Sequence, residues 1–377
     1  KLRFPGFDEP WKPALLSDYF AKNIKKNADG AITNVICNSA KQGLIPQRDY
    51  FDKDIANSDN TDGYYIIETN DFVYNPRKST DAPYGPISSY KYPEAGIVSP
   101  LYLCFRAKQE INPLYFEWYF RSSAWHRYIY MSGDSGARHD RVSIKDDTFF
   151  AMPINIPSAK EQDRIALFLN AIEQRIDKQR SLVEALKKYK RGAIAHILSG
   201  KDSEFAGEAI WAEKALSDLC CEFRSGRSIS ATLIHESGDY PVYGGNGIRG
   251  YCDHYSHEGE YVVVGRQGAL CGNVRLIRGQ NYLSEHAIAV RANEENDTKF
   301  LLYLLDFMNL GQYSDQGAQP GLAVNKLLRL KCNVPEKKIQ SKISAFLLTY
   351  DKQIAFQESI LSLLTAQRKA FLQQLFI

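Results

Sequence analysis

The stretch IALFLNAIEQRIDKQRSLVEALKKYKRGAIAHI, from Ile165 to Ile197, decides the fold of this 377-residue chain. Its apolar residues recur at alternating intervals of four and three, which is the spacing of a coiled-coil seam. Pro157 stands shortly before the stretch and Gly192 is its one helix-weakening residue, so we expect a single long helix. The predicted seam positions are Ile165, Leu169, Ile172, Ile176, Gln179, Val183 and Leu186, continued by Lys190, Ala193 and Ile197.

A second copy of this pattern lies 178 residues further along the chain. Pro157 and Gln162 reappear as Pro335 and Gln340. Because a 3.5-residue spacing keeps two helices in contact over many turns, each stripe predicts the other as its partner in an antiparallel coiled coil. Packing of an amphipathic helix against an ordinary core is the alternative. The second seam falls on Ile343, Leu347, Tyr350, Ile354, Gln357, Leu361 and Leu364.

One polar residue recurs near the middle of both seams, as Gln179 and Gln357. A polar residue buried at a seam position fixes the register and orientation of paired helices at some cost in stability. We therefore hypothesise that these two glutamines set the register of the helix pair.

A shorter repeat opens each half of the chain: Trp11 with Leu16-Ser17-Asp18 returns 200 residues later as Trp211 with Leu216-Ser217-Asp218. The repeats divide the chain into two domains, residues 1–157 and 201–334, and two spacer helices, residues 158–200 and 335–377. The fold class we expect is α+β, with two pseudo-symmetric domains separated by two long antiparallel coiled-coil helices.

The two domains are rich in tyrosine, glycine and short runs that are typical of strands. We expect helices at residues 112–130 and 297–310. Pro241 makes residues 240–243 an unfavourable central strand. The expected strands are residues 63–68, 72–75, 96–106, 260–265, 272–278 and 286–291.

The bulk composition excludes little. The formal net charge of +3 does not by itself indicate a nucleic-acid-binding protein, because affinity for phosphate depends on how charge is clustered. Seven cysteines without a C-x-x-C pair fit reduced thiols. The chain shows no signal-peptide pattern and no apolar run of about 18 residues, so we expect a cytoplasmic protein without a membrane partner.

Basic and amide side chains are concentrated in turn-rich stretches of both domains. Arg, Lys, Asn and Gln have the donor geometry that fits phosphates and base edges, and glycine lets the backbone approach a duplex. A solvated surface would show the same residues. The candidate DNA-contacting residues are Arg77, Lys78, Arg138, His139, Arg141, Arg224, Arg227, Asn246, Arg249, Arg266, Gln267, Gln319 and Lys326.

No pattern in the sequence predicts a catalytic centre. Residues 245–250 match G-x-G-x-x-G, but no helix is expected to follow them, so we interpret the match as a tight loop. There is no P-loop, no Asn-Pro-Pro-aromatic loop of an aminomethyltransferase, and no nuclease-like carboxylate pair. The spacing of Cys252, His254, His257 and Cys271 fits no zinc pattern, and we expect no metal.

These features together resemble the specificity subunits of type I restriction-modification systems, over the whole chain. The similarity lies in the opening Leu2–Phe7 with Trp11, in the paired tails 157–198 and 335–376, and in domain patterns such as Gly96-Ile-Val-Ser-Pro with Tyr102 and Tyr243-Gly-Gly-Asn-Gly. The first tail has the Glu161-Gln162 pair of the family, whereas the second departs from it with Ile339-Gln340.

The resemblance implies a non-catalytic subunit in which each domain recognises one half of a bipartite DNA site. Two modification and two restriction subunits are then the expected partners, with S-adenosylmethionine, ATP and Mg²⁺ used by those partners and no cofactor bound by this chain. A helix of residues 160–199 would be roughly 60 Å long, compared with about 34–36 Å for one DNA turn. Helix length would therefore set the unread spacer.

Three alternatives remain open from the sequence. The chain could belong to a methylation-only or fused restriction system, which neighbouring genes would reveal. It could be a divergent methyltransferase or nuclease, which activity of the purified chain would establish. It could also be a ligand-binding or scaffold protein, which would show no salt-dependent affinity for duplex DNA.

Overall fold

The computed structural model describes residues 2–50, 61–133, 140–199, 210–268, 270–315 and 321–376. The chain forms two compact units. Unit 1 consists of Lys1–Lys178 with Ile360–Ile377, and unit 2 consists of Gln179–Ser359. Each unit therefore combines one globular part with a segment of both long helices.

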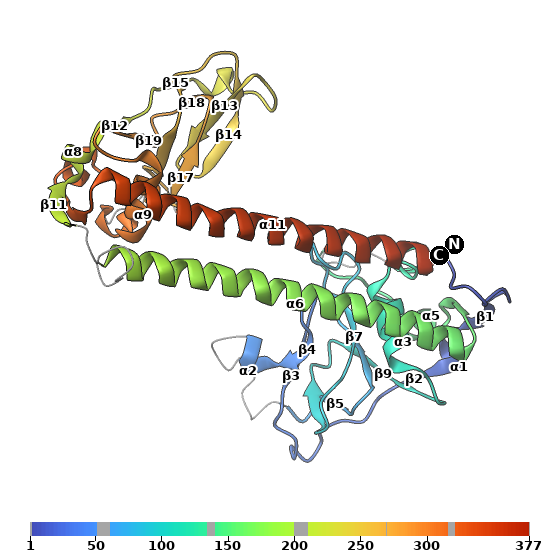
Figure 1. Ribbon diagram of the computed structural model, residues 1–377. Coiled ribbons are helices and arrows are strands. Elements are labelled where there is room, and N and C mark those ends of the chain that lie inside the picture. Colours follow the sequence, from blue (N-terminus) through green and yellow to red (C-terminus); the bar gives the residue numbers. More distant parts are fainter. Residues whose placement is uncertain are drawn as a thin grey trace. The chain divides into compact units, whose positions relative to one another are not determined.

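The two long helices are α6, Ala159–Leu198, and α11, Lys337–Leu375 (Figure 1). They begin in the same way, because the Gln162 side chain donates to the Pro157 carbonyl at 3.0 Å and the Gln340 side chain donates to the Pro335 carbonyl at 2.9 Å. The seam residues on both helices are buried or half-buried. The buried ones are Ile165, Leu169, Ile176, Val183, Ile343, Leu347, Ile354 and Leu364, and the half-buried ones are Ile172, Gln179, Leu186, Tyr350, Gln357 and Leu361.

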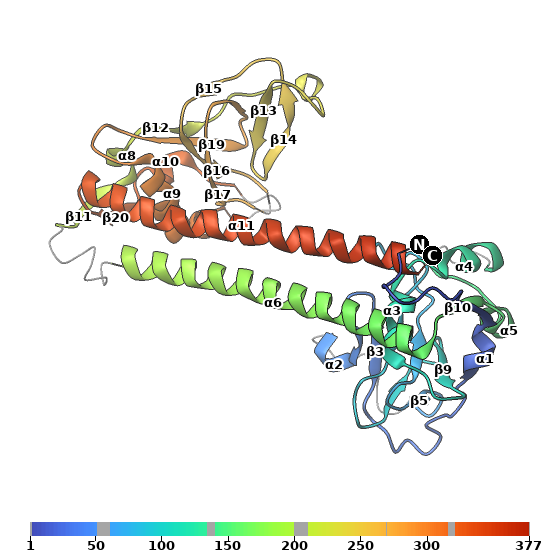
Figure 2. The same ribbon diagram turned by 45° about the vertical axis from the view of Figure 1, so that its right-hand side comes forward.

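Within each unit the two helix segments run antiparallel, as both views show (Figure 2). In unit 1, Phe168 meets Phe371 with ring centroids 5.0 Å apart, and Glu173 forms an ion pair with Arg368. In unit 2, the Gln179 side chain donates to the Gln357 side chain at 2.7 Å and Lys190 pairs with Asp351. Partner numbers fall as α6 numbers rise, so the predicted antiparallel pairing is confirmed.

The globular part of unit 1 is built on a four-stranded sheet of order β2-β9-β6-β7 that is packed against α3. Its core is aromatic, with Phe20, Phe72 and Phe105 fully buried. The elements of this part are β1 Lys12–Leu15, α1 Leu16–Tyr19, β2 Phe20–Lys22, β3 Ile36–Ser39, β4 Gly43–Pro46, α2 Gln47–Tyr50, β5 Tyr65–Ile67, β6 Phe72–Tyr74, β7 Ile87–Ser89, β8 Gly96–Val98, β9 Leu103–Ala107, α3 Pro113–Arg121, α4 His126–Ser132, α5 Asp146–Phe150 and β10 Pro153–Ile156.

Unit 2 repeats this plan with a sheet of order β12-β19-β16-β17 packed against α9. Its core is mainly aliphatic, with Val262, Ile288 and Val290 fully buried. The elements are β11 Ala212–Ala215, α8 Leu216–Leu219, β12 Cys220–Ser225, η2 Ala231–Leu233, β13 Tyr240–Gly244, β14 Gly247–Cys252, β15 His257–Glu258, β16 Tyr261–Gly265, β17 Val274–Ile277, β18 Gln280–Leu283, β19 Ala287–Ala292, α9 Thr298–Phe307, η3 Leu310–Tyr313, α10 Val324–Leu327 and β20 Lys331–Val334.

Strand register shows how closely the two units correspond. Val73 pairs with Cys104 and Ser88 in the unit 1 sheet, and Val263 pairs with Ala289 and Arg275 in the unit 2 sheet. The strand that opens each half, β1 or β11, pairs with the strand that precedes the long helix, β10 or β20. The expected pseudo-symmetry of the α+β fold is confirmed.

Two expected elements are each divided in the structure. Residues 96–106 form β8 and β9, which belong to different sheets and are joined by a turn in which the Tyr102 N–H donates to the Ser99 carbonyl. Residues 112–130 form α3 and α4, because Ser122 ends α3 and its hydroxyl donates to the Tyr119 carbonyl.

The expectation that Pro241 makes residues 240–243 an unfavourable central strand was wrong. β13 is an interior strand in a sheet of order β14-β13-β18-β15. Its parallel pairing with β18 covers only Val242 and Tyr243, so Pro241 has no ladder hydrogen bond to provide on that side. The first two residues of the G-x-G-x-x-G stretch, Gly245 and Asn246, form the tight hairpin turn between β13 and β14, as interpreted, whereas residues 247–250 belong to strand β14.

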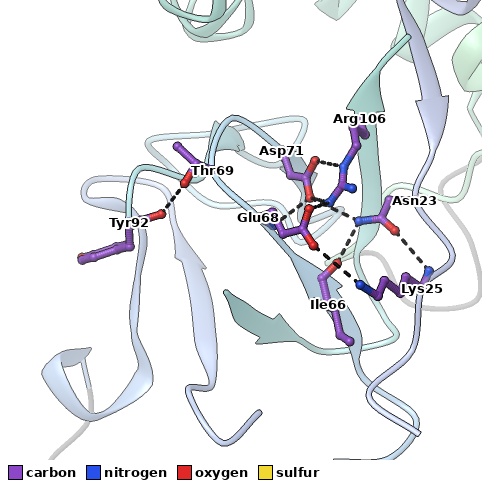
Figure 3. Close-up of polar contacts among 8 residues, drawn as sticks. All are labelled: Asn23, Lys25, Ile66, Glu68, Thr69, Asp71, Tyr92 and Arg106. Atoms are coloured by element: carbon purple, nitrogen blue, oxygen red, sulfur yellow. Dashed lines mark hydrogen bonds and ion pairs between the residues drawn. The ribbon is translucent and has the colours of Figure 1, made fainter. Parts of the chain in front are cut away.

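A polar cluster fixes the turn that leads into β6 (Figure 3). Arg106 on β9 donates to both carboxylate oxygens of Asp71, at 2.6 and 2.7 Å, and these bonds raise the pKa of Arg106. Asp71 also accepts the Glu68 N–H, and Asn70 between them has a φ of +70°. The Asp71 side chain is 1% exposed and that of Arg106 is 43% exposed, so the buried carboxylate is paired with a partly exposed guanidinium and the turn before β6 is held in place.

The contact between Gln179 and Gln357 can be tested by a double-mutant cycle. Either Gln→Leu change alone should lower the free energy of unfolding by about 1 kcal/mol, because the other amide loses its partner in the seam. The double variant should recover that loss, since an apolar pair suits the seam. Urea unfolding of the four proteins measures this coupling, and a crystal structure of the double variant showing unchanged register would contradict the role of the amides in setting it.

Candidate nucleic-acid interface

Three segments of unit 1 that are far apart in sequence meet at one pocket of about 370 Å³. They are the end of β3, the loop after β6 and the turn before β9. The residues that line the pocket include Asn38, Ser39, Asn75, Pro76, Arg77, Lys78, Ser99, Tyr102 and Arg141.

This pocket brings together three of the candidate DNA-contacting residues. Arg77 and Arg141 face each other in an isolated antiparallel bridge, and the Lys78 N–H donates to the Asp140 carbonyl at 2.8 Å. The Arg77 side chain is 67% exposed. Three cationic side chains are therefore held at the rim of one concave surface, which suits an anionic ligand.

Unit 2 has an equivalent cluster, which strand register identifies. Because Val73 corresponds to Val263, residues 75–78 correspond to residues 265–268. Gln267 and Gly321 form an isolated bridge like that of Arg77 and Arg141. The Leu322 N–H donates to the Arg266 carbonyl, as the Val142 N–H donates to the Pro76 carbonyl, both at 2.9 Å.

Glycines allow very close contact between the segments of the unit 2 cluster. A Cβ atom on Gly245 would lie 2.5 Å from the Gln267 carbonyl oxygen, and one on Gly265 would lie 2.4 Å from the Gly245 carbonyl oxygen. The Gln267 side chain bonds to the His286 ring at 2.6 Å. Asn246 lines a pocket of about 180 Å³ together with Gly245, Gly265 and Arg275.

The remaining candidates are distributed more widely. Arg249 packs over Gly244 with an exposed side chain, and Arg227 bridges to Ser284 next to the cluster. Arg224 instead lies on β12 and is bound to Glu222, while Lys326 lies on α10 and pairs with Asp315 at 3.0 Å. Arg138, His139 and Gln319 lie outside the described residues.

Sequence reasoning did not select Ser39, Ser99, Tyr102 or His286 as site residues. Ser99 and Tyr102 occur in a stretch that contributes to the family resemblance, but nothing in their spacing connects them to Arg77. The two halves could not be aligned here by sequence identity, so the correspondence became visible only through strand register. Burial raises the pKa of the Tyr102 hydroxyl, which keeps it neutral and able to donate.

The residues considered as metal ligands each form contacts with other groups. Cys252 and Cys271 donate to the carbonyls of His254 and Arg266, and the His257 ring lies between Ser256 and Glu222. Among the residues that the structure describes, no three His, Cys, Asp or Glu side chains are grouped as metal ligands would be. No helix within the described ranges has the length and apolarity needed to cross a membrane.

Comparison with known proteins agrees with this architecture. Residues 209–366 match the type I restriction modification DNA specificity domain. The EcoprrI type I restriction enzyme specificity subunit of Escherichia coli is 44% identical over 159 residues, which are 41% of this chain and 38% of that protein. A putative type I specificity subunit of Mycoplasma pneumoniae, an N-terminal portion, is 32% identical over 34% of this chain and 73% of that protein.

The chain belongs to the family of type I specificity subunits. The crystal structure of the type I restriction-modification S subunit from M. genitalium has the same fold, with a TM-score of 0.64 at 16% identity, over 100% of this chain and 98% of that one. The matches to three curated relatives of this family span only 38 to 45% of their lengths.

Glycine substitutions can test the close packing of the unit 2 cluster. Gly245→Ala should destabilise the protein by about 1–3 kcal/mol, because the new Cβ must displace the Gln267 carbonyl. Gly192→Ala in α6 is the matched control, since a Cβ there meets nothing within 4 Å. The control should stabilise by about 0.5–1 kcal/mol. Equal effects in thermal unfolding would show that the hairpin does not pack as described.

Proposed function

We propose that this chain is the DNA sequence-specificity subunit of a type I restriction-modification complex. Each unit recognises one half of a bipartite, asymmetric site and directs adenine methylation or cleavage by partner subunits. The observation that carries this proposal is a repeated loop contact: the loop after β6 bridges to residues 141–142 in unit 1, and the loop after β16 bridges to residues 321–322 in unit 2. Family membership supports it.

The side chains of the two clusters suit different halves of one asymmetric site. Unit 1 presents Arg77, Lys78 and Arg141, whereas unit 2 has Gln267 at the position that corresponds to Arg77 and Arg266 next to it. Arginine suits guanine edges and phosphates, and glutamine suits adenine edges. Two clusters with the same framework and different donors would therefore recognise different sequences.

The chemistry of the complex is assigned to other subunits. We propose two modification and two restriction subunits as partners, with S-adenosylmethionine, ATP and Mg²⁺ bound by those partners and not by this chain. The chain itself is proposed to be non-catalytic and to act in the cytoplasm. The length of α6 and α11 would set the number of unread base pairs between the half-sites. A methylation-only or fused system is the alternative assembly.

Phosphate contact by Arg77 and Lys78 in unit 1 predicts a specific dependence of DNA affinity on salt. Arg77→Gln and Lys78→Gln should each reduce the slope of log affinity against log salt by about 1 on a random-sequence duplex, because each removes one phosphate contact. Lys160→Gln, an exposed change at the start of α6, is the control and should leave the slope unchanged. Fluorescence anisotropy across a salt series measures the slopes, and identical slopes in all four proteins would refute the contact.

Methylome sequencing tests the function itself. Cells that carry this chain and its modification partner should show N6-methyladenine in one bipartite motif. Arg77→Ala should broaden only one half of the motif and Gln267→Ala only the other, because the two residues lie in different units. A contiguous motif, or a change in both halves from one substitution, is incompatible with one half-site per unit.

A further inference from the structure

The unit 1 pocket is a concave surface, which loops that only contact a DNA groove do not need. Side chains that read base edges protrude into a groove, whereas here the segments border a hollow of about 370 Å³. That volume falls in the range of pockets that bind small organic molecules. Pro76, Pro86, Leu101 and Tyr102 give the pocket an apolar surface that a bare phosphate would leave unused.

The polar groups of the pocket are rich in donors. The hydroxyl oxygens of Ser39 and Ser99 accept backbone N–H groups from Lys41 and Leu101, both at 3.3 Å, so their hydrogens stay free to donate. Tyr102 also presents a hydroxyl. A ligand with several acceptors and a flat apolar face fits this combination, and a nucleotide has both.

Two of the three cationic side chains of the pocket have no bound anion. Arg77 forms an ion pair with Asp140 at 3.7 Å. Across the described ranges, neither Lys78 nor Arg141 has a carboxylate at ion-pair distance. The Arg141 Nε is buried and has no hydrogen-bond partner in the structure. A buried donor of this kind calls for an acceptor from a ligand or solvent.

We propose that this pocket receives one nucleotide turned out of the DNA duplex, with its phosphate bound by Arg141 and Lys78 and its base packed against Tyr102. The inference rests on the proposed DNA-reading function and goes beyond it, because it adds extrusion of a nucleotide by the specificity chain itself. Binding energy from these contacts would offset the cost of unstacking and unpairing one base.

The two units differ in this respect. In unit 2 the corresponding hairpin and loop are in close backbone contact through Gly245 and Gly265, and the pocket that these glycines line has a volume of about 180 Å³, below the usual range for pockets that bind small organic molecules. The extruded nucleotide should therefore occur only in the half-site that unit 1 reads.

A mismatch scan separates extrusion from groove reading. The full chain, without partner subunits, is titrated with duplexes that carry its methylation motif and one mismatch at each position in turn. A protein that reads a paired base loses affinity at a mismatch, whereas a protein that extrudes the base gains it, because unpairing then costs less. We expect a gain of about tenfold at one position of the unit 1 half-site and losses elsewhere.

Substitutions in the pocket test whether the gain in affinity at a mismatch arises there. Tyr102→Leu and Arg141→Gln should abolish the mismatch preference, and Lys160→Gln should retain it. If either pocket variant fails to fold, 2-aminopurine at the favoured position provides a second readout in the unmodified chain. Its fluorescence should rise several-fold on binding, and an unchanged signal would overturn the proposal.

The mismatch scan distinguishes failure of the extrusion proposal from failure of the proposed function. Losses at every mismatch, or a gain only in the unit 2 half-site, would overturn the extrusion proposal and leave the proposed function intact. Absence of any affinity for the duplex would overturn both.

Discussion

The seam between α6 and α11 is the constraint on which the rest of the structure depends. Neither helix belongs to one unit, because each gives one part of its length to unit 1 and the other part to unit 2. The core of unit 1 includes Ile165 and Leu169 from α6 together with Leu375 from α11, and that of unit 2 includes Ile197 and Ile343. Neither globular part could keep its core if the helices separated, so helix pairing and domain folding are energetically linked.

The duplication preserves backbone contacts more strictly than side-chain chemistry. Both halves use a glutamine to begin the long helix and an aspartate to cap the short helix after the opening strand. In unit 1 the buried Glu161 binds Arg3 at two points and Trp11 at 3.1 Å. In unit 2 isoleucine replaces that glutamate, and the Trp211 Nε1 is buried without a partner. The framework therefore tolerates loss of a buried ion pair, because backbone pairing already defines the fold.

Features that repeat along the sequence were predictable from it. Features that depend on a single local hydrogen bond or on the length of a neighbouring strand were not. The seam residues repeat at fixed spacing over many turns, so the helix pair followed from pattern alone. The division of residues 112–130 depends on a hydroxyl of Ser122 that bonds to the helix backbone, which no hydrophobic pattern shows. Pro241 was misjudged because its strand pairs with β18 over only two residues. Such details depend on the length of a neighbouring strand, which the local sequence does not encode.

The candidate site, too, could be predicted only in part from the sequence. Composition could select Arg77, Lys78 and Arg141, but only the fold brings residue 141 to the loop after β6. The glycines of unit 2 were expected to permit a tight loop, and Gly245 and Gly265 also bring the hairpin and the loop after β16 into close backbone contact, which no local pattern shows.

Loop residues thus alter the binding surface without altering the framework. Asn75 in unit 1 stands where Gly265 stands in unit 2 according to strand register. The Asn75 side chain donates to the Asn38 carbonyl at 3.2 Å, whereas the absence of a side chain at Gly265 lets its backbone lie close to that of Gly245. Because the strands beneath have the same pairing in both units, recognition can diverge through a few loop substitutions at little cost to the core. The residues that maintain the framework are therefore separate from the loop residues that shape the surface, and under the proposed function this separation would let one fold serve different target sequences.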